Sequence, residues 1–415
     1  MSVVTIFGGI FCEQKAVIDD LVTGIGYQQL TQDEIVAQAS NIAEMPEAKI
    51  ERAFTAKTSV FNKFTQDKER AIAYLKLALA QKLAEDNLII AGCTGHLIPK
   101  SVSHVLRVCL IGDLKYRYEI AASPKNNNSQ LSEKEALKQI RKTDSDCSAW
   151  TDTVYGISDP WGDSIYDLVL PMDKLGAASA SSAIAENLLK DILRPTPESK
   201  QAVKDFLLAS QVGVELTKQG HDVQVNVSHG AITLVTNKKV LRQSRLDDEL
   251  KSIVEPLPGV KSVKTEVGKN FHQSDIYRKT DFKMPSKVLL VDDEREFVQT
   301  LSERLIMRDM GSAVVYDGEA ALNMVQDDEP EVLVVDLKMP NIDGFEVLKK
   351  VKASHPEIEV IVLTGHGSED DRLTCMELGA FAYMQKPVDI EELSFVLKEA
   401  QDKIRQDKEV THSET

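Results

Sequence analysis

Several polar residues in the last third of the sequence follow short apolar runs, and their types suit chemistry on an anionic group. The runs are VLLVDDE from Val288, VVDLKMP from Val334, VLTG from Val362 and MQKP from Met384. The polar residues are Asp292, Asp293, Asp336, Thr364 and Lys386. Three carboxylates held close together disfavour ionisation, and a divalent cation with oxygen ligands, such as Mg²⁺, relieves that cost.

Each apolar run is typical of a buried β-strand, and the runs are spaced as in a doubly wound α/β domain. Ligands of such sheets bind outside the carboxyl ends of parallel strands. We therefore expect the five polar side chains to converge on one crevice. The alternative is that the acidic residues only cap strands and helices, which would require five positions to agree in type and order without a common site.

In these residues and their order, residues 286–405 resemble the receiver domain of two-component response regulators. The resemblance implies that Asp336 accepts a phosphoryl group. It also implies that Asp292, Asp293 and Asp336 hold Mg²⁺ together with the main-chain carbonyl of Lys338. This agrees with the physical logic of phosphoryl transfer, in which a carboxylate serves as the nucleophile and a metal neutralises charge on the transferring group.

The same resemblance gives roles to residues at the ends of the last two strands. It implies that Lys386 pairs with the phosphoryl oxygens and that Thr364 and Tyr383 form a switch pair. Gly365 leaves room for its amide to approach the phosphoryl oxygens. Pro387 is the residue that the family has after this lysine, often joined through a cis bond.

Length and composition limit the other classes of protein. The 415 residues are too many for one core and indicate two or three domains. A net charge of −16 argues against bulk attraction to DNA or anionic membranes, and no DNA-binding motif is visible. No apolar stretch is long enough to span a membrane. Five scattered cysteines fit a reducing cytoplasm and indicate neither disulfides nor a zinc site.

The first part of the chain opens with an apolar strand, a Gly8-Gly9 turn and a helical pattern, which is the frame of a phosphate-binding loop. Gly9 and Lys15 fit the pattern G-x-x-x-x-G-K-[ST]. Gln14 replaces its second glycine and Ala16 its hydroxyl residue, so efficient ATP chemistry is not expected. Lys15 is therefore either a phosphate ligand or an ordinary residue of the first helical turn.

The layout of about 190 residues is similar to cytidylate-kinase-like proteins of the P-loop nucleoside monophosphate kinase group. Arg117 matches a phosphate-clamping arginine of that family, so Gly9, Lys15 and Arg117 are the candidate nucleotide-binding residues. Cys93 and Cys147 stand where the family has arginines, and cysteine cannot clamp phosphate by bidentate contacts. We therefore favour a degenerate kinase module kept for binding or signalling. A residual kinase and an unrelated α/β domain remain the alternatives.

The middle of the chain reads as a smaller module with an α-β-β-α-β order. Gly230, Gly259 and Val260 stand where the BON domain has its turn glycine and its closing Gly-Val. This resemblance implies a binding or packing module, and a simple spacer between neighbouring domains is the alternative. No catalytic group of residues is visible in it.

The predicted fold class is α/β. It comprises an amino-terminal P-loop-kinase-like domain, a small α+β middle domain and a five-stranded parallel receiver of the flavodoxin-like, doubly wound type. The predicted segments are a kinase-like domain at 1–194, a BON-like domain at 195–268, a linker at 269–286, the receiver at 287–405 and a disordered tail at 406–415. A polar linker of this kind would let phosphorylation alter contacts between domains.

The hypothesis for function is a cytoplasmic response regulator that receives a phosphoryl group from a sensor histidine kinase or a phosphotransfer protein. Because the receiver stands at the end of the sequence, its output is expected in the amino-terminal modules or in a separate protein. The alternatives are a receiver-regulated nucleotide kinase of the CMP type and an adaptor or phosphate sink. A homodimer and a nucleotide on the first domain are left open.

Overall fold

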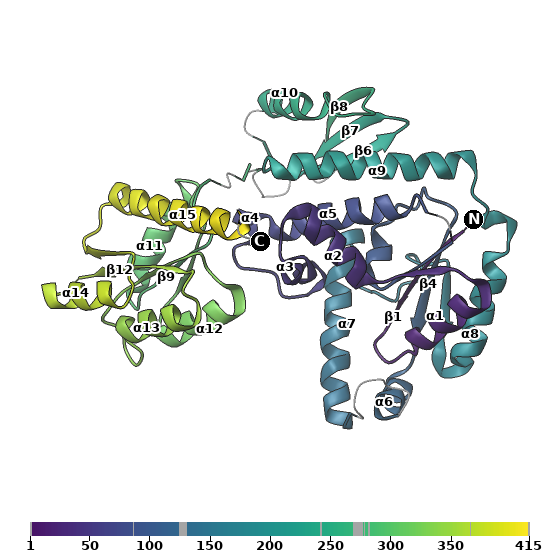
Figure 1. The fold of residues 1–415 in the computed structure, drawn as a ribbon, viewed down its shortest axis with the longest axis horizontal. Coiled ribbons are helices and arrows are strands. Elements are labelled where there is room, and N and C mark those ends of the chain that lie inside the picture. Colours follow the sequence, from purple (N-terminus) through teal and green to yellow (C-terminus); the bar gives the residue numbers. More distant parts are fainter. Residues whose placement is uncertain are drawn as a thin grey trace. The chain divides into compact units, whose positions relative to one another are not determined.

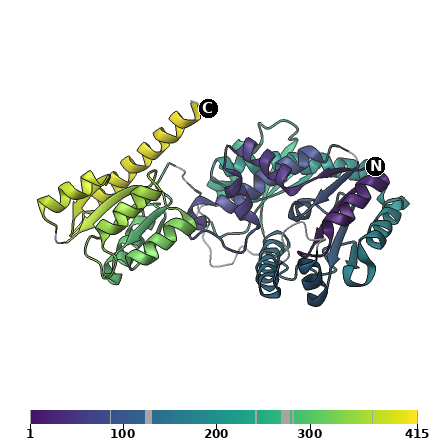
Figure 2. The same ribbon diagram turned by 60° about the horizontal axis from the view of Figure 1, so that its bottom comes forward.

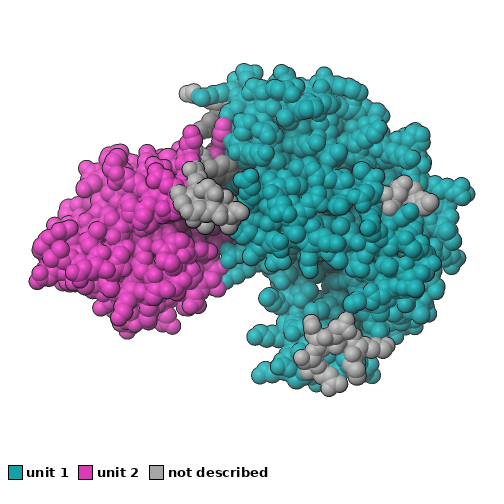
Figure 3. Space-filling view, viewed as in Figure 1, with its two compact units in different colours: residues 1–58, 67–278 teal, residues 59–66, 279–415 magenta. Residues whose placement is uncertain are grey.

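The computed structural model describes residues 2–85, 87–123, 131–240, 243–268, 277, 279–280, 283–365 and 367–413. These residues form two five-stranded parallel sheets and a three-stranded mixed sheet, which confirms the predicted α/β class. The chain divides into two compact units, coloured separately in Figure 3. Unit 1 comprises residues 1–58 and 67–278, and unit 2 comprises residues 59–66 and 279–415.

The sheet of unit 1 has the strand order β2-β3-β1-β4-β5, with every pair parallel. Its strands are β1 (Val3–Gly8), β2 (Gln28–Leu30), β3 (Leu88–Ala91), β4 (Val105–Ile111) and β5 (Leu168–Pro171). Its helices are α1 (Gln14–Ile25), α2 (Gln32–Ala43), α3 (Glu47–Glu51), α5 (Asp67–Lys82), α6 (Leu114–Ala122), α7 (Glu133–Tyr155) and α8 (Met172–Leu188). Short 3₁₀ turns are η1 (Arg52–Phe54), η2 (Cys93–Leu97) and η3 (Asp191–Leu193).

Two apolar cores flank this sheet. One core joins α1 and α8 to the sheet, and the other joins α2, α5 and α7 to its opposite face (Figure 1). Because β1 is covered on both faces, its residues are apolar almost without interruption, as expected for the central strand of a parallel sheet. The side chains of Thr31 and Ser132 begin α2 and α7 with capping boxes.

The middle module has the predicted α-β-β-α-β order. Its elements are α9 (Pro197–Lys218), β6 (Gln224–Ser228), β7 (Ala231–Thr236), α10 (Gln243–Val254) and β8 (Ser262–Val267). The helix α9 belongs to two cores. Phe206 and Val214 pack with α5 of the first module, whereas Val212 and Leu216 pack with the small sheet. The boundary predicted at residue 195 therefore falls at the start of a shared helix, and the two modules cluster as one unit.

Unit 2 has a parallel sheet of order β10-β9-β11-β12-β13. Its strands are β9 (Val288–Val291), β10 (Ser312–Val315), β11 (Val332–Val335), β12 (Glu359–Thr364) and β13 (Ala382–Gln385). Its helices are α4 (Asn62–Thr65), α11 (Arg295–Ile306), α12 (Gly318–Asp328), α13 (Gly344–Ser354), α14 (Glu369–Glu377) and α15 (Ile390–Ser413). One core joins the sheet to α12 and α13 and the other joins it to α11 and α15, so helices cover both faces.

Residues 59–66 come from the first part of the sequence but belong to unit 2. Phe61 is fully buried in the core that contains Leu289 of β9. The amide of Val60 donates a hydrogen bond of 2.7 Å to the Asp328 carboxylate at the end of α12. These contacts attach a segment of the predicted kinase-like domain to the core of unit 2.

The carboxy-terminal segment differs from the prediction. Residues 406–415 were expected to be disordered, but α15 continues to Ser413 and its last turns extend beyond the rest of unit 2 in Figure 2. Residues 400–413 contain neither glycine nor proline, so nothing in the sequence stops the helix. The side chain of Lys408 also forms an ion pair of 3.1 Å with Glu331.

The predicted linker at 269–286 lies largely outside the described residues. Its Tyr277 is held by the middle module, since its amide donates to the Lys239 carbonyl at 2.9 Å and its hydroxyl lies 2.7 Å from His221 Nδ1. In the described part of the chain, no helix is both long and apolar enough to cross a membrane.

Candidate functional site

The chemistry-bearing residues of unit 2 lie at the carboxyl ends of its parallel strands. Asp292 and Asp293 follow β9, Asp336 follows β11, Thr364 ends β12 and Lys386 follows β13. These strands are neighbours in the sheet, so the residues that follow them meet at one edge. The prediction that sequence-distant residues share a crevice is therefore met for Asp292, Asp336 and Lys386, which are in direct contact.

Lys386 is the centre of the cluster. Its ammonium nitrogen lies 2.6 Å from Asp292 Oδ2, 3.2 Å from Glu294 Oε1 and 3.5 Å from Asp336 Oδ1. It also lies 4.5 Å from the centre of the Phe297 ring, which places the cation over an aromatic face. The peptide bond that joins Lys386 to the following proline is cis.

Backbone amides fix the two buried carboxylates. Asp336 Oδ2 accepts a hydrogen bond of 2.9 Å from the amide of Lys338, and Asp292 Oδ1 accepts one of 2.8 Å from the amide of Glu294. Each carboxylate therefore has one oxygen on the backbone and the other directed at Lys386. Asp336 is only 6% exposed, so its free oxygen is presented in a defined direction.

Burial and charge act in opposite senses on these groups. Burial raises the pKa of Asp292, and the hydrogen bond from Lys386 only partly offsets it. Burial lowers the pKa of Lys386, but the hydrogen bond to Asp292 and the charges of Asp292 and Asp336 outweigh it and raise that pKa. Lys386 is therefore protonated at neutral pH.

The donor set fits a hard divalent cation. Four carboxylates face the single positive charge of Lys386, and they belong to Asp292, Asp293, Glu294 and Asp336. The cavity beside them has a volume of about 530 Å³, and its lining includes Asp293, Asp336 and Lys338. No group of three or more histidine, cysteine or carboxylate side chains in the described residues is arranged as a metal cage. A site that uses a few carboxylates, a carbonyl oxygen and water, as Mg²⁺ prefers, needs no such cage.

Thr364 and Tyr383 lie close together beside this cluster. A Cβ built on Gly367 would overlap the Tyr383 hydroxyl and lie 2.9 Å from the Thr364 methyl group, so both side chains approach Gly367 closely. The hydroxyl of Tyr383 is buried and has no hydrogen-bond partner among the described residues, and burial raises its pKa. A polar group held in this way can move to a partner elsewhere at little cost.

In unit 1 the structure brings Gly9 and Arg117 together but not Lys15. A Cβ on Gly9 would lie 3.2 Å from the Arg117 guanidinium carbon. Arg117 is buried and bonded within the protein, because it donates to the Ile10 carbonyl at 2.9 Å and forms a bidentate pair of 2.7 and 2.9 Å with Asp144. Lys15 is exposed and pairs instead with Asp19 one helical turn away.

The loop between β1 and α1 also uses amides that a phosphate would need. The amide of Gly9 donates to the Leu110 carbonyl at 3.1 Å, and that of Cys12 donates to the Gly9 carbonyl at 3.2 Å. The helix α1 begins at Gln14 without a side-chain cap. A phosphate-binding loop works through several amides that face the anion, and here two of them face the protein.

Family models match both ends of the chain. Residues 288–398 match the response regulator receiver domain, and residues 3–174 match the cytidylate kinase-like family. The chain carries a receiver domain and a cytidylate kinase-like domain. The predicted resemblance of both regions to these families is thus confirmed, while the resemblance of residues 195–268 to the BON domain stays a prediction.

Two curated response regulators each match about a quarter of the chain. The transcriptional regulatory protein CpxR of Escherichia coli (strain K12) is 43% identical over 108 residues, which are 26% of this chain and 46% of that protein. The response regulator MprA of Mycolicibacterium vanbaalenii is 33% identical over 110 residues, which are 26% of this chain and 48% of that protein. This chain spans about half the length of the curated relatives it matches.

A solved structure of similar sequence is the response regulator receiver domain protein from Clostridium thermocellum. It is 30% identical, covers 29% of this chain and 97% of its own, and has a TM-score of 0.28.

Some residues of the two domains were not among the predicted site residues. In the receiver domain, Glu294 and Phe297 contact Lys386, and the DDE run was the available signal for Glu294. In the cytidylate kinase-like domain, Cys93 lies in contact with Cys147, and this contact, together with burial, raises the pKa of Cys93 well above its usual value. A cysteine side chain carries no positive charge that could pair with a nucleotide phosphate.

Proposed function

We propose that the protein is a response regulator of a two-component phosphorelay, in which Asp336 accepts a phosphoryl group from a sensor histidine kinase or a phosphotransfer protein. The observation that carries the proposal is the placement of Asp336. Its Oδ2 is held by the Lys338 amide and its Oδ1 lies 3.5 Å from the Lys386 ammonium. A nucleophilic carboxylate beside a fixed cation is what transfer of an anionic group requires.

In the proposed reaction, Asp336 Oδ1 attacks the phosphorus of a phosphohistidine. The phosphorus–nitrogen bond breaks as the phosphorus–oxygen bond forms, and the imidazole leaves with the electron pair. Lys386 stays protonated and compensates charge on the phosphoryl oxygens. Asp292, Asp293, Asp336 and the Lys338 carbonyl would hold Mg²⁺, which supplies further compensation of negative charge when bound.

The switch residues are proposed to be Thr364 and Tyr383. The Thr364 side chain lies at the end of the strand next to β11, and Tyr383 lies against it with a hydroxyl that has no partner among the described residues. When the Thr364 hydroxyl turns towards the phosphoryl group, the space beneath Gly367 changes and Tyr383 follows. Such a shift requires different contacts in the two states.

The output is proposed to lie in the amino-terminal modules. Residues 59–66 fall inside the span matched by the cytidylate kinase-like family, yet Phe61 is buried in the core of unit 2. A change in that core therefore acts on a segment of the kinase-like domain. The net charge of −16 disfavours DNA as the target. A cytoplasmic location is part of the proposal, because a phosphorelay partner would act there.

We propose that the cytidylate kinase-like domain is a degenerate binding module. Lys15 is paired with Asp19 on the surface, Arg117 is committed to Asp144, and the Gly9 amide is bonded within the protein. Residues 195–268, with their resemblance to the BON domain, are proposed as a second binding or packing module. Under the alternative of a regulated nucleotide kinase, Mg²⁺-ATP would bind tightly and more weakly to Lys15→Ala. No binding at millimolar ATP would contradict that alternative.

The proposal is tested by phosphorylating the full chain with acetyl phosphate and Mg²⁺ and measuring the intact mass. The wild type is expected to gain one phosphoryl group and Asp336→Asn none. Asp370→Asn, an exposed residue of α14, serves as the matched control and is expected to behave like the wild type. Full labelling of Asp336→Asn would overturn the assignment.

A further inference from the structure

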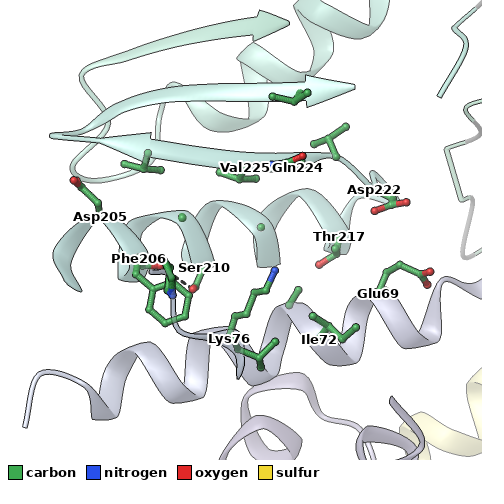
Figure 4. A pocket seen from close by; sticks show the side chains of 18 of the residues that line it. Glu69, Ile72, Lys76, Asp205, Phe206, Ser210, Thr217, Asp222, Gln224 and Val225 are labelled. Carbon is green, nitrogen blue, oxygen red and sulfur yellow. Dashed lines mark hydrogen bonds between the residues drawn. The ribbon is translucent and has the colours of Figure 1, made fainter. Parts of the chain in front are cut away.

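Unit 1 contains a cavity of about 660 Å³ between its two modules. Most of its lining comes from α5, from α9 and from the strands β6 and β7, and Figure 4 shows α9 between α5 and these strands. Cavities that hold small organic ligands have volumes of about 300 to 1,000 Å³. The cavity shares no residue with the receiver cluster or with the loop that contains Gly9.

Lys76 is one of the charged residues that line this cavity. It stands on the inner side of α5 one turn after Ile72, and Figure 4 shows its side chain extending towards α9. Lys76 forms no hydrogen bond or ion pair with any residue that the structure describes. Burial lowers its pKa, and the more distant charge of Asp222 only partly compensates. A partly buried ammonium without a counterion costs free energy, and an anionic ligand in the cavity would offset that cost.

The other charged residues of the lining, Glu69 among them, have interactions of their own. Lys238 pairs with Asp222 at 2.8 Å, and Asp205 accepts hydrogen bonds of 3.0 Å from the His229 amide and 3.1 Å from Gln201. Lys76 is therefore the cation of the lining that is available to a ligand.

The wall formed by α9 leaves open space at Gly213, which also lines the cavity. Gly213 stands in the interior of this 22-residue helix, and a Cβ built on it would meet no atom within 4 Å. Alanine would stabilise such a helix by about 0.5 to 1 kcal/mol relative to glycine, so packing does not explain the glycine. The hydroxyl of Ser210 donates to the Phe206 carbonyl at 2.8 Å, which leaves its polar group satisfied.

The lining indicates the charge and the shape of a ligand. Lys76 offers one positive charge, and Ile72, Phe206 and Val225 offer apolar surface around it. A phosphate dianion needs several donors, such as an arginine fork or a set of amides, and it would be repelled by the acidic residues Asp205 and Asp222. A carboxylate carries a single negative charge, so one cation can compensate it and the acidic residues of the lining repel it less than they would a phosphate dianion.

We propose that this cavity binds a small organic monocarboxylate with an apolar body. The carboxylate contacts the ammonium of Lys76 and the apolar body fills the space beside Gly213. Because α9 belongs to the cores of both modules, a ligand here would stabilise their packing against each other. This binding site is independent of the receiver chemistry.

The test is calorimetric titration of the full chain with octanoate below its micelle concentration and with benzoate, and with octanol as a neutral comparison. Saturable binding of at least one carboxylate, tighter than that of octanol, is expected. Lys76→Met is expected to weaken it by at least about tenfold, the loss of one charge-assisted hydrogen bond. Lys204→Met, which removes an exposed lysine of α9, is the matched control and should bind as the wild type does.

A second variant guards against a change of fold. Gly213→Leu places a side chain in the open space, so it should abolish binding while the melting temperature stays the same or rises. The proposal is overturned if neither carboxylate binds the wild type, or if Lys76→Met and Gly213→Leu bind as tightly as the wild type.

Discussion

The ammonium of Lys386 lies 2.6 Å from Asp292 Oδ2, and this contact ties the last strand of the receiver domain to the first. Lys386 follows β13 at one edge of the sheet, whereas Asp292 follows β9 near its centre. The pair stands beside Asp336, to which Lys386 makes a longer contact of 3.5 Å. A single cation therefore compensates the buried charge of both carboxylates.

Replacing Lys386 by methionine should lower the free energy of unfolding of unit 2 by about 3 kcal/mol, because two buried carboxylates lose their counterion. Mg²⁺ should recover more stability in this variant than in the wild type. Both tryptophans, Trp150 and Trp161, lie in unit 1, so hydrogen exchange of β9 and β11 is the suitable measurement.

Lys349→Met, at an exposed position of α13, is the control for this variant and should change neither the stability nor its dependence on Mg²⁺. Equal behaviour of the two variants would contradict the role given to Lys386.

The stability of unit 1 should depend on the buried residue His96. Trp150 donates to its Nδ1 at 3.2 Å, so Nε2 carries the proton and faces the Tyr166 hydroxyl at 3.1 Å. Burial lowers the pKa of His96 to about 4 from 6.5. The unfolded chain thus binds the extra proton first as pH falls. The free energy of unfolding should therefore be highest above pH 6.5 and should fall by about 3 kcal/mol as the pH falls to about 4.

Urea unfolding followed by tryptophan fluorescence between pH 4 and 7 measures this dependence. His96→Gln should remove the slope contributed by this residue, whereas His229→Gln, at an exposed position, should retain it. An unchanged slope in His96→Gln would show that His96 is not the group that titrates.

Phe61 should stabilise the receiver domain although it comes from the kinase-like span. Phe61→Ala removes a fully buried ring from a core that contains Leu289 and should cost about 3 to 5 kcal/mol. Hydrogen exchange of the β9 and β11 amides measures the loss. Val60→Ala, at a residue 44% exposed, is the neighbouring control and should cost much less. Similar small effects of both changes would mean that the segment is not part of the receiver core.

Arg117 should matter for the folding of unit 1 and Lys15 should not. Arg117→Lys loses the bidentate pair with Asp144 in a buried setting and should cost about 2 kcal/mol. Lys15→Ala removes an exposed pair with Asp19 and should change the stability by less than about 0.5 kcal/mol. Urea unfolding followed by tryptophan fluorescence compares the two variants, and a larger loss of stability in Lys15→Ala would contradict these assignments.

The contacts of Asp292, Asp336 and Lys386 could be predicted because strand ends determine them. Each residue directly follows an apolar run, and parallel neighbours bring such residues to one edge. The contact of Phe297 with Lys386 could not be predicted, since it depends on how α11 leaves the sheet. The exposed position of the Lys15 side chain could not be predicted either, because the motif spacing gives the place of a residue in the chain but not the direction of its side chain.

The arrangement of the modules was less predictable than their existence. A helix at the start of the middle module was expected, but its role in two cores depends on apolar residues on both of its sides, such as Phe206 and Val212. The burial of Phe61 has no local signal, because the run SVFNKF shows neither a helical nor a strand period. Contacts between segments far apart in the chain decide such cases.

The central claim is that the state of the receiver domain governs the amino-terminal modules. The most direct test is hydrogen exchange of the full chain with and without Mg²⁺ and beryllofluoride, an analogue of the phosphoryl group, in the wild type and in Asp336→Asn. We expect the analogue to change the exchange of residues 59–66 and of other parts of residues 1–268 in the wild type alone. If it protects the surroundings of Asp336 but leaves residues 1–268 unchanged, the claim is wrong and the protein acts as an adaptor or a phosphate sink.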